Sequence, residues 1–154
     1  MKKIDRPIEV LLIEDDPASA RLTELAIERS QAGGRVSIVG EGSSALKYLK
    51  RVGQYKGVGR PSLILLDITL GGMTGWEVLS CIKDDPGLKG IPVVVLTASQ
   101  DEYYVQHCYE MGADGLINKP MSTEKYEEML ETQEDFILSI EGQPYCELPP
   151  DIWY

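Results

Sequence analysis

The sequence predicts an α/β fold in which a doubly wound, five-stranded parallel sheet is covered by five helices on its two faces. Five short apolar segments alternate along the chain with five segments of helical periodicity, a pattern typical of right-handed crossover units. The central segment, residues 62–67, is apolar almost to its last residue and is followed by a glycine-rich turn. Such a run is typical of a parallel strand that is buried on both faces.

Local sequence signals place the individual elements. The expected strands are residues 8–13, 36–40, 62–67, 91–99 and 115–118. Pro17 opens the first helix, because proline is well tolerated in a first turn, and its apolar face is expected at Ala18, Leu22, Leu25, Ala26 and Arg29. The later helices are expected at 43–52, from 76 to a stop at Pro86, at 101–111 and at about 122–140.

Composition and charge limit the kinds of partner. The 154 residues suit one domain of ordinary size. Fifteen Lys and Arg stand against 25 Asp and Glu, which gives a net charge of −10, and the basic residues form no run. Because such a surface repels phosphate backbones and anionic membranes, we expect neither nucleic acid nor membrane among the partners.

The N-terminus and the cysteines indicate the compartment. The apolar run VLLI near the N-terminus is too short for a signal peptide or a membrane span. Cys81, Cys108 and Cys146 are odd in number and show no CxxC spacing. We therefore expect free thiols in a reducing compartment, and a cytoplasmic protein.

Polar side chains that could act on a phosphoryl group end four of the five strands. Glu14, Asp15 and Asp67 would together form an oxygen cluster suited to Mg²⁺. Thr97 and Lys119 could hold phosphoryl oxygens. Taken singly, each of these residues is more often a solvated loop residue or a helix cap. Because the carboxyl ends of parallel strands share one edge, the joint pattern favours a site where an aspartate attacks phosphorus beside a cation.

The order of LLIEDD, LILLD with its glycine turn, VVVLTAS and GADGLINKP resembles the receiver domain of response regulators, over residues 8 to about 140. The resemblance implies a flavodoxin-like fold with strand order 2-1-3-4-5. It divides the chain into a receiver domain, 1–140, and a proline-rich and aromatic tail, 141–154.

The same resemblance assigns roles to the strand-end residues. It implies that Asp67 accepts phosphate from the phosphohistidine of a sensor histidine kinase. The implied Mg²⁺ ligands are Glu14, Asp15, Asp67 and the backbone carbonyl of Thr69. Thr97 and Lys119 would contact the phosphoryl group. The protein would then signal by altered docking, with only Mg²⁺-dependent self-phosphorylation and self-dephosphorylation as chemistry of its own.

A narrower resemblance concerns the kinase. The loop GQYKGVGRP, the segment IKDDPGLKGIPVVVLTAS and the absence of an output domain are similar to single-domain regulators that are paired with cyanobacterial and bacterial phytochromes. The expected kinase is therefore of the phytochrome type.

Two residues depart from the family pattern. Leu116 stands where the family usually has Tyr or Phe, three residues before the lysine. Because leucine has no ring that could change position on phosphorylation, another element must carry the change to the surface. The candidate is the surface of the helix at 101–111, with Tyr103, Tyr104 and His107. Gly71 stands where a proline is common, and we expect it to loosen the turn.

The sequence leaves two roles for the tail and two alternative functions. Tyr145, Trp153 and Tyr154 either pack back on the domain or bind a second subunit or partner, together with the last helix. A phosphate-independent receiver is one alternative function, which Leu116 favours. An aspartate-nucleophile phosphatase is the other, but Thr69 stands where such an enzyme needs a second acid.

Overall fold

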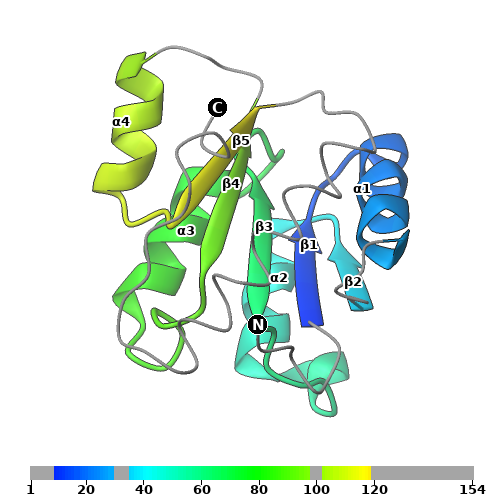
Figure 1. Cartoon of the computed structure of the whole chain (residues 1–154). Coiled ribbons are helices and arrows are strands. Elements are labelled where there is room, and N and C mark those ends of the chain that lie inside the picture. Colours follow the sequence, from blue (N-terminus) through cyan, green and yellow to red (C-terminus); the bar gives the residue numbers. More distant parts are fainter. Residues whose placement is uncertain (1–8, 30–34, 98–101, 119–154) are drawn as a thin grey trace, which may run out of the picture.

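The computed structural model describes residues 9–29, 35–97 and 102–118. Its elements, drawn in Figure 1, are β1 (Glu9–Ile13), α1 (Pro17–Arg29), β2 (Arg35–Val39), α2 (Gly42–Lys50), the 3₁₀ turn η1 (Gly53–Tyr55), β3 (Leu63–Asp67), α3 (Gly75–Asp84), β4 (Val93–Thr97), α4 (Glu102–Glu110) and β5 (Gly115–Asn118). Each of the five expected strands is present. The helix expected at about 122–140 and the tail 141–154 lie outside the described residues.

The five strands form one parallel sheet in the order β2-β1-β3-β4-β5, as predicted. In the register of this sheet Ile13 lies opposite Leu66, and Asp67 lies opposite Leu96. The carboxyl ends of β1, β3 and β4 therefore come level at one edge of the sheet, to which their arrowheads point in Figure 1. The residues that follow these strands meet at this edge.

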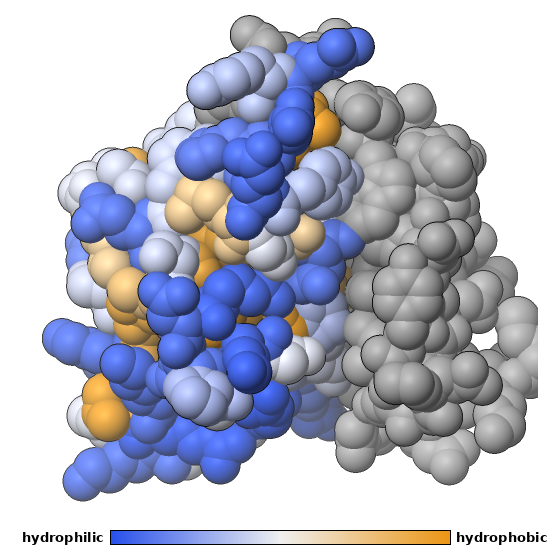
Figure 2. Space-filling view, turned by 90° about the vertical axis from the view of Figure 1, so that its left-hand side faces the viewer, coloured by the Kyte–Doolittle hydropathy of each residue, from blue (hydrophilic) through white to orange (hydrophobic). Residues whose placement is uncertain are grey.

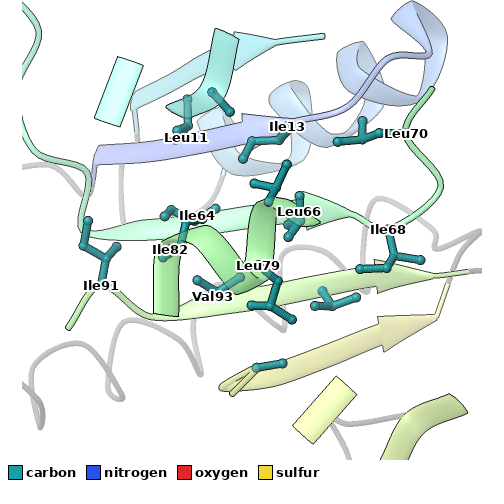
Figure 3. Packing of buried hydrophobic residues seen from close by; sticks show 14 of the residues in the cluster. Leu11, Ile13, Ile64, Leu66, Ile68, Leu70, Leu79, Ile82, Ile91 and Val93 are labelled. Atoms are coloured by element: carbon teal, nitrogen blue, oxygen red, sulfur yellow. The ribbon is translucent and has the colours of Figure 1, made fainter. Parts of the chain in front are cut away.

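Both faces of the sheet are packed. Every residue of β3 and β4 is buried, which confirms that the central strand is covered on both faces. One face packs against α1, in a cluster made of Val10, Leu12, Ala20, Ile27, Leu63, Leu65, Val94, Leu96 and Ile117. The alternate residues face α2, α3 and α4, and Figure 3 shows side chains of β1, β3 and β4 meeting those of α3.

The predicted buried face of α1 is wrong at Ala18 and Leu22, whereas Leu25 is half-buried and the side chains of Ala26 and Arg29 lie outside the described part. Ala18 is exposed and Leu22 is 42% exposed, whereas Ala20, Thr23 and Ile27 are buried. The reason is the hydroxyl of Thr23, which donates a hydrogen bond to the Ser19 carbonyl oxygen over 3.1 Å. Because this bond satisfies the hydroxyl within the helix, a polar residue occupies the core-facing stripe, which hydropathy alone does not indicate.

The start of α3 is held tightly against the end of β3. Thr74 and Glu77 form a capping box, in which the Glu77 N–H donates to the Thr74 hydroxyl oxygen over 3.2 Å. A Cβ added at Gly75 would lie 2.5 Å from the Ile68 Cα, so no side chain fits there. The turn between β3 and α3 is thereby anchored where the helix begins.

At the opposite edge of the sheet, an ion pair joins three elements. The Lys83 Nζ of α3 lies 2.8 Å from Asp114 Oδ2, and the same oxygen accepts a hydrogen bond from the Val93 N–H over 2.9 Å. Asp114 precedes β5 and belongs to the GADG segment. Its role is therefore structural, because it ties α3, β4 and β5 together.

Two of the cysteines are described, and both are free thiols as predicted. Cys81 is exposed and Cys108 is buried, and burial raises the pKa of the Cys108 thiol to about 11. Cys146 lies outside the described residues. Cys108 therefore stays protonated near neutral pH and fills space in the core on the buried side of α4.

None of the helices described by the structure is long and apolar enough to cross a membrane. The face seen in Figure 2 is mostly hydrophilic, and hydrophobic residues show there only as small patches between polar side chains.

Arg51, which ends α2, has a left-handed backbone with φ 57° and ψ 45°. This conformation lets the Val52 N–H bond the Lys47 carbonyl over 3.1 Å, as in a Schellman motif. Because left-handed backbone is strained in any residue with a Cβ, we expect Arg51→Gly to raise the free energy of unfolding by about 0.5–1 kcal/mol. Urea unfolding measures this, with Arg51→Ala as the control that removes the charge and keeps the strain. Equal stability of the two variants would contradict the explanation.

Candidate functional site

Asp67 is the last residue of β3 and lies at the centre of the site. Only 2% of Asp67 is exposed, because its strand is apolar and covered on both faces. Its Oδ1 accepts two hydrogen bonds from Thr69, one from the backbone N–H over 2.9 Å and one from the hydroxyl over 2.8 Å. Two donors on one oxygen fix the orientation of the carboxylate.

Glu14 and Asp15 follow β1 directly and meet Asp67 because β1 pairs with β3. Glu14 is 3% exposed, and its N–H donates to the Val39 carbonyl over 3.0 Å. Asp15 is exposed, and its Oδ2 accepts a hydrogen bond from the Gly71 N–H over 3.3 Å. One carboxylate oxygen from each of Glu14, Asp15 and Asp67 lies within 4.8 Å of the other two.

This donor set fits a divalent cation. Three carboxylates at such distances repel one another, and a cation between them would offset that repulsion. Carboxylate oxygens are the ligands that Mg²⁺ and Mn²⁺ prefer. Thr69 lies in the turn that follows Asp67, so it is close in the chain to the cluster, and the role of its carbonyl as a ligand stays a prediction.

Of the two residues predicted to hold the phosphoryl group, the structure describes Thr97 but not Lys119. Thr97 ends β4, next to β3 in the sheet, and is 1% exposed. It therefore lies at the same sheet edge as Asp67. Lys119 lies outside the described residues, directly after Asn118, whose backbone pairs with Thr97.

Leu116, the departure from the family pattern, is a core residue. It lies opposite Val95 in the pairing of β4 with β5, and none of it is exposed. Its side chain fills the cluster that also holds Val105 and Cys108 of α4. It thus takes part in packing and offers no surface group.

A ring contact joins α3 to α4 close to the site. The rings of Trp76 and His107 lie 4.7 Å apart between their centres and are tilted by 56°. Trp76 belongs to the first turn of α3, which follows the turn after Asp67. The sequence singles out His107 but not this partner, because a contact between two helices leaves no periodic signal.

Sequence patterns also did not predict a surface depression that lies beside Asp15. It has a volume of about 580 Å³, which is within the range of sites for small molecules. It is lined by Asp15, Gly40, Glu41, Gly42, Ser43, Gly71, Gly72 and Met73. Four glycines in two of these loops are the sequence signal that could have indicated it.

Comparisons with known proteins agree with this geometry. The family model of the response regulator receiver domain matches residues 10–131. The chain is 37% identical to the response regulator Rcp1 of Synechocystis sp. over 132 residues, which cover 86% of this chain and 90% of that protein.

Two solved structures are similar over most of the chain. The phosphorylated cyanobacterial phytochrome response regulator RcpA superposes with a TM-score of 0.76 and 36% identity, covering 94% of this chain and 99% of RcpA. The Mn²⁺-bound form of Rcp1 superposes with a TM-score of 0.73 and 35% identity, covering 93% of this chain and 99% of that one. Sheet order, acidic cluster and family match thus agree, and the chain belongs to the response regulator receiver domain family.

Proposed function

We propose that this receiver domain accepts a phosphoryl group on Asp67 from a sensor histidine kinase, in a Mg²⁺-dependent reaction, and signals by altered docking to other proteins. The observation that carries the proposal is the meeting of Glu14, Asp15 and Asp67 oxygens within 4.8 Å at the end of a buried strand. A carboxylate held in this position, beside two further acids that can share a cation with it, is suited to attack a phosphorus atom.

The transfer requires little covalent chemistry from the protein. An oxygen of Asp67 bonds to phosphorus while the bond from phosphorus to the histidine nitrogen breaks, and the imidazole keeps the electron pair and takes up a proton. The product on this chain is an acyl phosphate. Glu14, Asp15 and Asp67 would hold a cation, which would supply positive charge to offset that of the phosphoryl group. Thr97 and Lys119 contact the phosphoryl oxygens.

The arrangement of Thr69 favours phosphoacceptance over phosphatase chemistry. An aspartate-nucleophile phosphatase needs an acid that protonates the leaving group. The Thr69 hydroxyl instead donates to Asp67 over 2.8 Å, and its proton is far too weakly acidic for that role. The phosphoryl group would therefore stay on Asp67 until water removes it.

The phosphoacceptor is tested by incubating the chain with acetyl phosphate and Mg²⁺ and measuring intact mass. We expect one labile phosphoryl group on the parent, none without a divalent cation and none on Asp67→Asn, because asparagine lacks the nucleophilic oxygen. Asp16→Asn is the matched control, since Asp16 is exposed and its Oδ1 accepts a hydrogen bond from the Ala18 N–H at the start of α1. This variant should be labelled like the parent. Label on Asp67→Asn would refute the assignment, and an unlabelled parent that binds no Mg²⁺ would indicate a phosphate-independent receiver.

The kinase is proposed to be of the phytochrome type, on the strength of the likeness to Rcp1 and to the phytochrome response regulator RcpA. We expect phosphoryl transfer from a phosphorylated phytochrome-type kinase to be at least about tenfold faster than from a kinase of another class, which corresponds to about 1.4 kcal/mol of specific docking. Radiolabel transfer over a time course measures both rates. Equal rates from the two donors would remove the phytochrome assignment.

The tail 141–154 is proposed to be separate from the receiver domain 1–140 and to hold a second subunit through Tyr145, Trp153 and Tyr154. In support, the family match ends at residue 131, and aromatic residues are common interface anchors. We expect a chain that ends at residue 141 to elute as a monomer in size-exclusion chromatography with light scattering, and the full chain as a dimer. The same mass for both would rule out this role.

A further inference from the structure

The strongest observation that the proposed function leaves unused is the hydrogen bond between two turns of the site. The Gly71 N–H donates to Asp15 Oδ2 over 3.3 Å, across 56 positions of the chain. A proline at position 71 would have no N–H to donate. The residue at position 71 therefore supplies a donor that a proline could not supply.

We propose that the Gly71 N–H is a positioning group that holds the Asp15 carboxylate in the metal site, so that the affinity for a divalent cation depends on a residue other than proline at position 71. This inference rests on the role proposed above for Asp15 as a metal ligand. The affinity for the cation would then depend on a backbone N–H as well as on the side chains that bind it.

Asp15 needs such a donor more than the other two acids do. Glu14 is 3% exposed and Asp67 is 2% exposed, so packing restricts their rotamers. Asp15 is exposed, and an exposed side chain loses rotamer freedom when it binds a cation. A donor that orients the carboxylate beforehand reduces that loss, and donors of this kind typically change metal affinity 10- to 100-fold.

The turn is built to keep this N–H in place. Its near end is tied to Asp67 by the two hydrogen bonds of Thr69. Its far end is held by Gly75, where a Cβ would meet the Ile68 Cα at 2.5 Å. The left-handed position falls on Gly72, with φ +67°, so residue 71 itself does not require glycine.

The hydrogen bond and a bound cation are compatible on the same side chain. A carboxylate has two oxygens with about four lone-pair positions. The Gly71 N–H uses one of these positions on Oδ2 and leaves others for the cation. The bond therefore orients the ligand without competing for it.

The hydrogen bond itself is tested without any metal. In the metal-free protein, the Gly71 amide proton should show the downfield NMR shift of a hydrogen bond to a carboxylate. That shift should be lost in Asp15→Ala and largely kept in Asp15→Asn, whose amide oxygen still accepts. A Gly71 amide shift that is the same in the parent and in Asp15→Ala would overturn the inference.

The consequence for the metal is tested by calorimetric titration with Mg²⁺. The comparison is between Gly71→Pro and Gly71→Ala, because both restrict the backbone but only alanine keeps the N–H. An alanine Cβ meets Asp15 Oδ2 at 3.8 Å, an ordinary contact. We expect the proline variant to bind Mg²⁺ about tenfold more weakly than the alanine variant, with the same unfolding midpoint when metal-free. Equal affinities would overturn the inference.

Asp15→Ala separates this inference from the proposed function. If Asp15→Ala binds Mg²⁺ as tightly as the parent, Asp15 is no ligand, and both the metal site as proposed and the inference fail. If it binds more weakly while Gly71→Pro and Gly71→Ala bind equally, the metal site stands and only the role of Gly71 is refuted.

Discussion

The pairing of β1 with β3 is the constraint on which the rest of the site depends. Ile13 lies opposite Leu66 in this pairing, so Glu14 and Asp67 each follow a paired, buried residue at the same level of the sheet. Because both strands are packed on two faces, polar groups are excluded until the strands end. The carboxylates are therefore brought together by the burial of the residues before them, and a shift of one residue in register would separate them.

The turn after Asp67 is the second requirement, because the strand ends alone do not orient the carboxylates. Its donors reach both sides of the cluster, from Thr69 to Asp67 and from Gly71 to Asp15. These donors stay in place because the helix start at Gly75 lies against Ile68, with no room for a side chain. Core packing of α3 is thus coupled to the geometry of the acids through only a few residues of backbone.

Much of this arrangement could be predicted from the sequence, and the exceptions share a cause. The strands and the meeting of Glu14, Asp15 and Asp67 follow from apolar runs that end in acid, whereas the strand order followed only from the resemblance to receiver domains. The buried face of α1 was missed because Thr23 satisfies its hydroxyl within the helix. The donor at Gly71 was missed because a backbone N–H leaves no mark in the sequence, and its partner is 56 residues away. Periodicity detects burial, whereas polar contacts depend on tertiary geometry.

Leu116 limits how a change at Asp67 can reach the surface. It is fully buried in the cluster that packs α4, and a buried aliphatic side chain has no polar group that could follow the phosphoryl oxygens. The turn after Asp67, in contrast, leads directly into Trp76, whose ring lies 4.7 Å from that of His107 on α4. Since packed cores have discrete arrangements and do not deform continuously, a displaced turn would change the packing at this contact between α3 and α4, where Trp76 and His107 meet.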